Sequence, residues 1–142
     1  MKHTRRIYLA GPYTHPDPAV REGRYRALTQ VTAGFTQQGE LVYSPVTYTH
    51  PWASITPGLP PDFEFWRAHC LSILRAWATE LLVLRLPGWE ESRGVKAEID
   101  LATAMGLEVS YVDPVFDERI VEPLGGENDH VQRQAQNGHM QA

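Results

Sequence analysis

Residues 81–94 read Leu-Leu-Val-Leu-Arg-Leu-Pro-Gly-Trp-Glu-Glu-Ser-Arg-Gly, and the apolar run at their start is the strongest strand signal in the chain. A loop follows over residues 87–94. A helix is then expected over residues 95–105, because apolar side chains recur there at helical spacing. Residues 107–112 predict a further strand. This strand–helix–strand succession is typical of a parallel sheet.

The N-terminal part of the chain shows the same alternation. Ile7, Tyr8 and Leu9 form an apolar run that predicts a buried strand over residues 6–10. A helix is predicted over residues 19–38, and a second short strand over residues 41–43. We therefore expect an α/β fold, a Rossmann-like or flavodoxin-like three-layer sandwich. Its four to five parallel strands would be covered by helices on both faces.

Prolines separate these two regions. Five of them fall within residues 45–62, together with Gly58 and several aromatic side chains. This composition predicts a long irregular loop, of a kind that is usually functional or mobile in a compact domain. Asp62 is expected to cap a helix that runs through Trp77.

Length and composition favour one domain over residues 1–114. The chain has 142 residues, of which 42% are hydrophobic, enough for a single core. Beyond Pro114 it becomes polar and poor in large apolar residues, so a disordered tail is predicted over residues 115–142.

The net charge and the number of cysteines limit the kinds of partner and the cellular compartment that we expect. Thirteen Lys and Arg residues against 17 Asp and Glu residues give a net charge of -4, which argues against a nucleic-acid polymer as partner. The single cysteine, Cys70, excludes an internal disulfide. No stretch approaches the length of a membrane span or signal peptide. We expect a soluble cytoplasmic protein.

The ligand site is expected where the loops after the strands gather. In an open parallel sheet, ligands bind outside the carboxyl ends of the strands. Gly11, Pro12 and Tyr13 follow the first strand, and Gly88 to Gly94 follow the strand at residues 81–84. The second loop leads into a helix N-terminus, whose free N–H groups favour an anion such as a phosphate.

Glu98 is the strongest candidate for chemistry from the pattern alone. It falls on the same helix face as Val95 and Ala102, so its carboxylate is expected to point inward. A buried carboxylate costs stability unless it has a partner, and such groups are common at functional sites. The alternative is a structural glutamate that pairs with backbone donors or with Arg85 or Arg93.

Other candidates have structural explanations of equal or greater weight. Ser92 fits a helix N-cap as well as a phosphate ligand. Tyr8 and Tyr13 could stack on a base, but they could equally be core or loop anchors. His69 and Cys70 point about 100° apart on a helix and do not form a nucleophilic pair. The six histidines are scattered, so neither a metal nor a cofactor is predicted. The aromatic residues around the proline-rich loop fit a lid or a structural anchor, namely Trp52, Phe63, Phe65 and Trp66.

Two segments carry a family resemblance. Residues 7–13, Ile-Tyr-Leu-Ala-Gly-Pro-Tyr, and residues 88–99, Gly-Trp-Glu-Glu-Ser-Arg-Gly-Val-Lys-Ala-Glu-Ile, resemble the signature regions of the nucleoside 2-deoxyribosyltransferase-like superfamily. The match is to a small branch related to nucleoside 5′-monophosphate N-glycosidases and spans roughly residues 5–114. The pattern Ser-x-Gly-x-x-x-Glu is its more specific part.

The resemblance implies a function for several of these residues. Glu98 matches the catalytic glutamate, which attacks or stabilises the anomeric carbon as the base leaves. Ser92 and Gly94 match positions that hold a 5′-phosphate, whereas the nucleoside transferases carry an acid in place of the serine. Tyr8 and Gly11 correspond to positions that flank the sugar and base. Pro12 and Tyr13 would shape the pocket.

The chain departs from the family pattern at one position. Relatives place an aspartate on the helix before the central strand, where it orients the sugar or protonates the base, and Cys70 stands near that position here. Either Asp62 or Glu64 takes over, or the chemistry is altered.

Three functions follow from the resemblance and from this departure. The leading hypothesis is an enzyme that hydrolyses nucleoside monophosphates. The alternatives are an enzyme that transfers 2-deoxyribosyl groups and a non-catalytic nucleotide sensor. The family also implies a homodimer or larger assembly.

Overall fold

The computed structural model describes residues 4–114, so the expected tail at residues 115–142 lies outside the described part of the chain. Strands and helices alternate, as expected from the apolar spacing. The elements are β1 (Arg6–Ala10), α1 (Pro18–Gln37), β2 (Leu41–Tyr43), α2 (Pro45–Ile55), α3 (Phe63–Trp77), β3 (Glu80–Leu84), the short 3₁₀ helix η1 (Trp89–Glu91), α4 (Arg93–Ala104) and β4 (Glu108–Val112).

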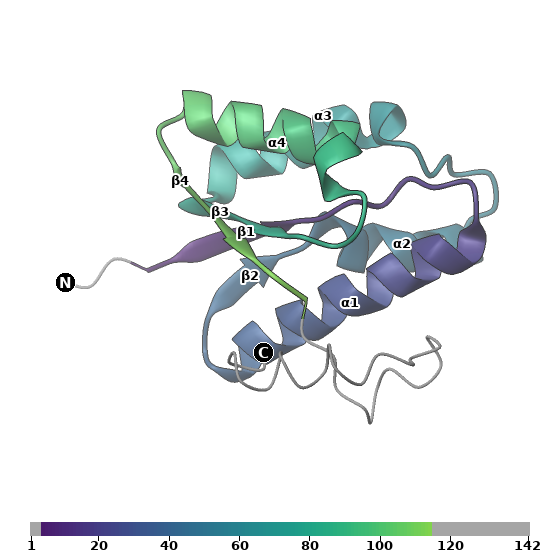
Figure 1. The fold of residues 1–142 in the computed structure, drawn as a ribbon, viewed down its shortest axis with the longest axis horizontal. Helices are drawn as coiled ribbons and strands as arrows, with labels where there is room; N and C mark the ends of the chain where they lie inside the picture. Colours follow the sequence, from purple (N-terminus) through teal and green to yellow (C-terminus); the bar gives the residue numbers. More distant parts are fainter. Residues whose placement is uncertain (1–3, 115–142) are drawn as a thin grey trace.

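The four strands of this region form one parallel sheet in the order β2-β1-β3-β4. Helices α1 and α2 lie on one face of the sheet, and α3 and α4 lie on the other (Figure 1). The predicted α/β fold, with a Rossmann-like or flavodoxin-like three-layer arrangement, is thereby confirmed. After β1 the chain adds β2 on one side of it, and then returns to add β3 on the other side. The carboxyl ends of β1 and β3 therefore flank a topological switch point.

The two faces of β1 serve two apolar cores. Tyr8 and Ala10 pack with residues of α3 and α4, whereas Leu9 packs with Leu28 and Val31 of α1. All of these side chains are buried. Since successive strand residues point to opposite faces, Tyr8 is directed toward the layer that carries Glu98.

The prediction of an irregular loop over residues 45–62 was wrong for most of its length. Residues 45–55 form the helix α2. Ser44 caps it by accepting a hydrogen bond from the Thr47 N–H, and Pro45 takes the first helical position, where its missing N–H costs nothing. The helix also contains Pro51, a residue that normally interrupts helices. Proline density therefore concealed a helix whose start is well specified.

No helix within residues 4–114 combines the length and the apolarity that a membrane span requires.

Candidate functional site

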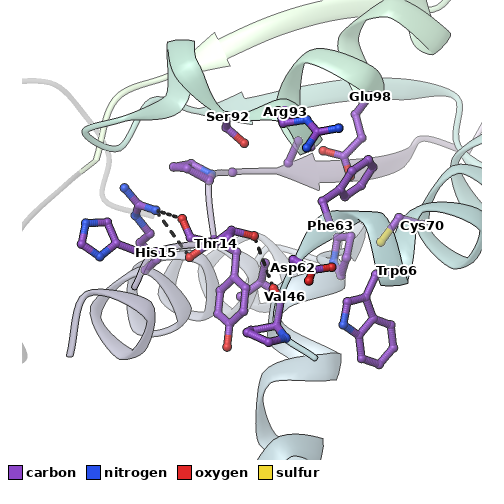
Figure 2. Close-up of a pocket in the computed structure, with 18 of the residues that line it drawn as sticks. Thr14, His15, Val46, Asp62, Phe63, Trp66, Cys70, Ser92, Arg93 and Glu98 are labelled. Atoms are coloured by element: carbon purple, nitrogen blue, oxygen red, sulfur yellow. Dashed lines mark hydrogen bonds between the residues drawn. The ribbon is translucent and has the colours of Figure 1, made fainter. Parts of the chain in front are cut away.

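A cavity of about 520 Å³ lies at the carboxyl ends of β1 and β3. The loop after β1 and the segment at residues 88–94 form two of its walls. Residues of α2 and α3, together with Arg24 of α1 and Glu98 of α4, complete the lining. Figure 2 shows Ser92, Arg93 and Glu98 on the α4 side of the pocket, and Phe63, Trp66 and Cys70 on the α3 side.

Seven of the eight sequence-predicted site residues line this one cavity: Gly11, Pro12, Tyr13, Gly88, Ser92, Gly94 and Glu98. They come from the loop after β1 and from the segment that runs from Gly88 into α4, and the parallel sheet brings these two parts of the chain together. The eighth, Tyr8, is not part of the lining. It is fully buried, and its hydroxyl contacts the carboxyl of Glu98, which lines the pocket.

Glu98 is buried in the first turns of α4 and has only 5% of its surface exposed. The hydroxyl of Tyr8 donates a 2.6 Å hydrogen bond to Glu98 Oε2. The arginine partners expected as alternatives are engaged elsewhere, Arg85 with Asp113 and Arg93 with Glu64. The partner of the buried carboxyl is therefore a neutral hydroxyl on β1.

This environment favours the protonated form of the carboxyl. Burial raises the pKa of Glu98 to about 8, because the charged form loses its hydration, while the hydrogen bond from Tyr8 opposes that rise. Glu98 is thus poised to change protonation state slightly above neutral pH. A cationic centre in the cavity would favour its ionised form.

The start of α4 offers donors to an anion. Ser92 is the N-cap, and its Oγ accepts a 3.1 Å hydrogen bond from the Val95 N–H, which confirms the predicted cap. Among residues 4–114 the Ser92 hydroxyl only accepts, so its O–H can be donated to a ligand. At Gly94 a Cβ would lie 2.9 Å from the Phe63 ring, so a side chain there would press on the cavity wall.

Arg24 of α1 ties the two ligand loops together. Its guanidinium donates to the carbonyl oxygens of Tyr13 and Thr14 on one loop, and to that of Pro87 on the other. Gly88 has a φ of 92°, and a Cβ there would lie 2.7 Å from Arg24 Nη2. The positive φ therefore favours glycine here, and a side chain would also push on the end of Arg24.

Family membership follows from residues 5–113, which match the model of the family described as domain of unknown function DUF1937. The chain belongs to the DUF1937 family. Among curated proteins, none matches it.

Three titratable side chains of the DUF1937 domain, one thiol and two acids, lie in the region where the superfamily resemblance implies an aspartate. Cys70 is buried against the cavity, and burial together with the charge of Glu98 raises the pKa of its thiol to about 12. Asp62 and Glu64 also line the cavity. Asp62 is occupied by capping α3, as expected, and Glu64 pairs with Arg93 at 2.5 Å.

Several site residues of the DUF1937 domain have no distinct sequence signal. In the sequence, Arg24 is one of several polar residues on a predicted amphipathic helix. Thr49 lies in the segment that was predicted to be a loop. Of the aromatic residues considered for a lid, Phe63 and Trp66 line the cavity. The other two, Trp52 and Phe65, are exposed. Within residues 4–114, no group of three or more His, Cys, Asp or Glu side chains is arranged to hold a metal ion.

Proposed function

We propose that this DUF1937 domain hydrolyses the N-glycosidic bond of a nucleoside 5′-monophosphate through Glu98. The observation that carries the proposal is a carboxyl group that lines the cavity, is 5% exposed, and accepts its hydrogen bond from a neutral tyrosine. A structural glutamate is normally satisfied by an arginine or by several backbone donors. The resemblance of residues 88–99 to the superfamily signature supports the same assignment.

The chemistry requires a negative charge beside the anomeric carbon. When the C1′–N bond breaks, the sugar acquires oxocarbenium character, which a nearby carboxylate stabilises or traps as a covalent glycosyl ester. The developing positive charge favours the ionised form of Glu98 at its buried position. Water then attacks the anomeric carbon and releases the sugar phosphate.

Ser92 supports a monophosphate as the substrate. Three features meet at this edge of the cavity: the Ser92 hydroxyl, the N-terminus of α4, and the backbone next to Gly94. Free N–H groups and the dipole at a helix N-terminus favour a phosphate. An acid at position 92 would instead repel it, which is why the serine argues against a free nucleoside and against 2-deoxyribosyl transfer.

Ser92→Asp separates the capping role of Ser92 from its ligand role. Aspartate caps helices as well as serine does, so the unfolding free energy is expected to change by less than about 0.5 kcal/mol. The added charge is expected to raise the KM for a monophosphate at least about tenfold while leaving the KM for the matching nucleoside unaltered. Steady-state kinetics on both substrates checks this. Equal changes in the two KM values would place the phosphate elsewhere.

Tyr8→Phe is expected to move the rising limb of the kcat/KM profile to higher pH. The hydrogen bond from Tyr8 lowers the pKa of Glu98, so its loss leaves less carboxylate at a given pH. Base release at pH 7 should fall about tenfold relative to the wild type, and the difference between the two proteins should shrink as the pH rises. A uniform loss across the pH range would show that Tyr8 acts in another way.

A panel of ribo- and deoxyribonucleoside monophosphates, with the matching nucleosides as controls, tests the proposal. Free base and sugar phosphate should form in equal amounts, and faster from monophosphates than from nucleosides. A new nucleoside on addition of a second base would indicate transfer. Tight binding without any cleavage would indicate a sensor, in line with the thiol of Cys70 where relatives have an aspartate.

A further inference from the structure

A second cluster of polar groups reaches the same cavity from the opposite face of the sheet. Tyr13 lines the cavity, and its hydroxyl lies 2.6 Å from Nδ1 of His50 on α2. Nε2 of His50 lies 2.9 Å from Oε1 of Glu22 on α1. Tyr25 stacks on the imidazole with ring centroids 4.3 Å apart, which holds the ring in place. The three groups thus form a continuous phenol–imidazole–carboxylate chain.

The hydrogen-bond roles in this chain follow from its outer end. The Glu22 carboxylate only accepts, so Nε2 of His50 carries a proton. When His50 is neutral, its Nδ1 accepts from the Tyr13 hydroxyl. When His50 is protonated, Nδ1 donates to the Tyr13 oxygen, and the Tyr13 proton becomes available to the cavity. The chain can therefore pass a proton in either direction.

Charged side chains stand at both ends of this chain. Glu22 also accepts a hydrogen bond from Arg26. Burial raises the pKa of Tyr13, although the charge of Arg21 opposes the rise. Tyr13 is thus a hydroxyl that donates a proton, and not a phenolate, at neutral pH.

We infer that Tyr13, backed by His50 and Glu22, supplies the proton to the departing base in the reaction proposed for Glu98. The inference rests on that proposed function. It also gives the departing base a proton source other than Cys70, since the candidate replacements Asp62 and Glu64 are engaged in a helix cap and an ion pair. The Tyr13 hydroxyl takes part in neither a helix cap nor an ion pair, and its partner is the imidazole that can replace its proton.

The step conserves atoms and charge. As the C1′–N bond breaks, its electron pair goes to the base nitrogen, which takes the Tyr13 proton. Tyr13 in turn takes the Nδ1 proton of His50, and His50 becomes neutral with Nε2–H still donated to Glu22. In the second half, the water that attacks C1′ gives up a proton, which returns through Tyr13 to His50. The net reaction is hydrolysis, with no other reactant.

Two substrates that differ in their leaving group test this assignment. The departing base of a nucleotide needs a proton, whereas 4-nitrophenolate leaves without one. Tyr13→Phe and His50→Asn are each expected to lower kcat for the best monophosphate about 100-fold. With 4-nitrophenyl ribofuranoside 5-phosphate, kcat should stay within about threefold of the wild-type value, because no proton transfer is required. Tyr48→Phe, the same substitution at an exposed position of α2, is the matched control.

The outcomes separate this assignment from the proposed function. The double variant Tyr13→Phe/His50→Asn should be no slower than either single variant, since each substitution removes the same proton-transfer path. If Glu98-dependent cleavage is found but the Tyr13 and His50 variants slow both substrates equally, or neither, the relay is overturned and the function of Glu98 stands. If the wild type cleaves neither substrate, both proposals fail.

Discussion

From about pH 5 to about pH 8, the wild-type domain is expected to lose about 3 kcal/mol more unfolding free energy than the Glu98→Gln variant. The sign follows from the direction of the pKa shift. The pKa of Glu98 rises from 4.5 to about 8 on folding, so in this range the folded state keeps a proton that the unfolded state releases. The stability contribution is complete below about pH 4.5 and is lost as the pH rises to 8.

Glutamine removes this titration while it keeps the shape of the side chain and an acceptor for the Tyr8 hydroxyl. Urea denaturation at several pH values measures the difference between the two proteins. Glu90→Gln is the control, because Glu90 is exposed on η1 and its loss should leave the slope unchanged. Parallel curves for wild type and Glu98→Gln would show that Glu98 is not held in a desolvated site.

Base release by Glu98→Gln and Glu98→Ala is expected to fall at least about a thousandfold, with monophosphate binding retained by the glutamine variant. The carboxylate stabilises charge that exists only in the transition state, so its removal should affect kcat more than KM. This is the largest kinetic effect expected from any single substitution in the cavity.

Rescue by a small anion distinguishes a lost carboxylate from a lost fold. Glu98→Ala leaves space beside Tyr8, so added formate is expected to restore part of the release of 4-nitrophenol from 4-nitrophenyl ribofuranoside 5-phosphate. Glu90→Gln should show neither loss nor rescue. A glutamine variant that retains wild-type turnover would remove Glu98 from the chemistry.

The α/β alternation and the inward direction of Glu98 were predictable because they depend on local periodicity. Apolar runs at residues 7–9 and 81–84 mark buried strands, and the spacing of Val95, Glu98 and Ala102 defines one helix face. Parallel strands then bring the two glycine-bearing loops to one edge. These steps were sufficient to place seven of the expected site residues in one cavity.

The partners of these residues were not predictable, because they come from other elements. Tyr8 and Glu98 are 90 positions apart, and nothing in the sequence distinguishes a tyrosine that supports a carboxyl from one in the core. The contact between Tyr13 and His50 depends on α2, which five prolines in residues 45–62 concealed. Hydrogen bonds over such separations follow from the packing of helices on the sheet, which periodicity does not specify.

The central claim, that Glu98 acts on an N-glycosidic bond, is tested most directly by chromatography of free base after incubation with nucleoside 5′-monophosphates at about pH 8. Wild type and Glu98→Gln are compared at equal concentration, and binding is measured in parallel. The account predicts stoichiometric base and sugar phosphate from at least one monophosphate with the wild type, and neither with the variant. Intact monophosphate bound equally well by both proteins, with no base released, would contradict it.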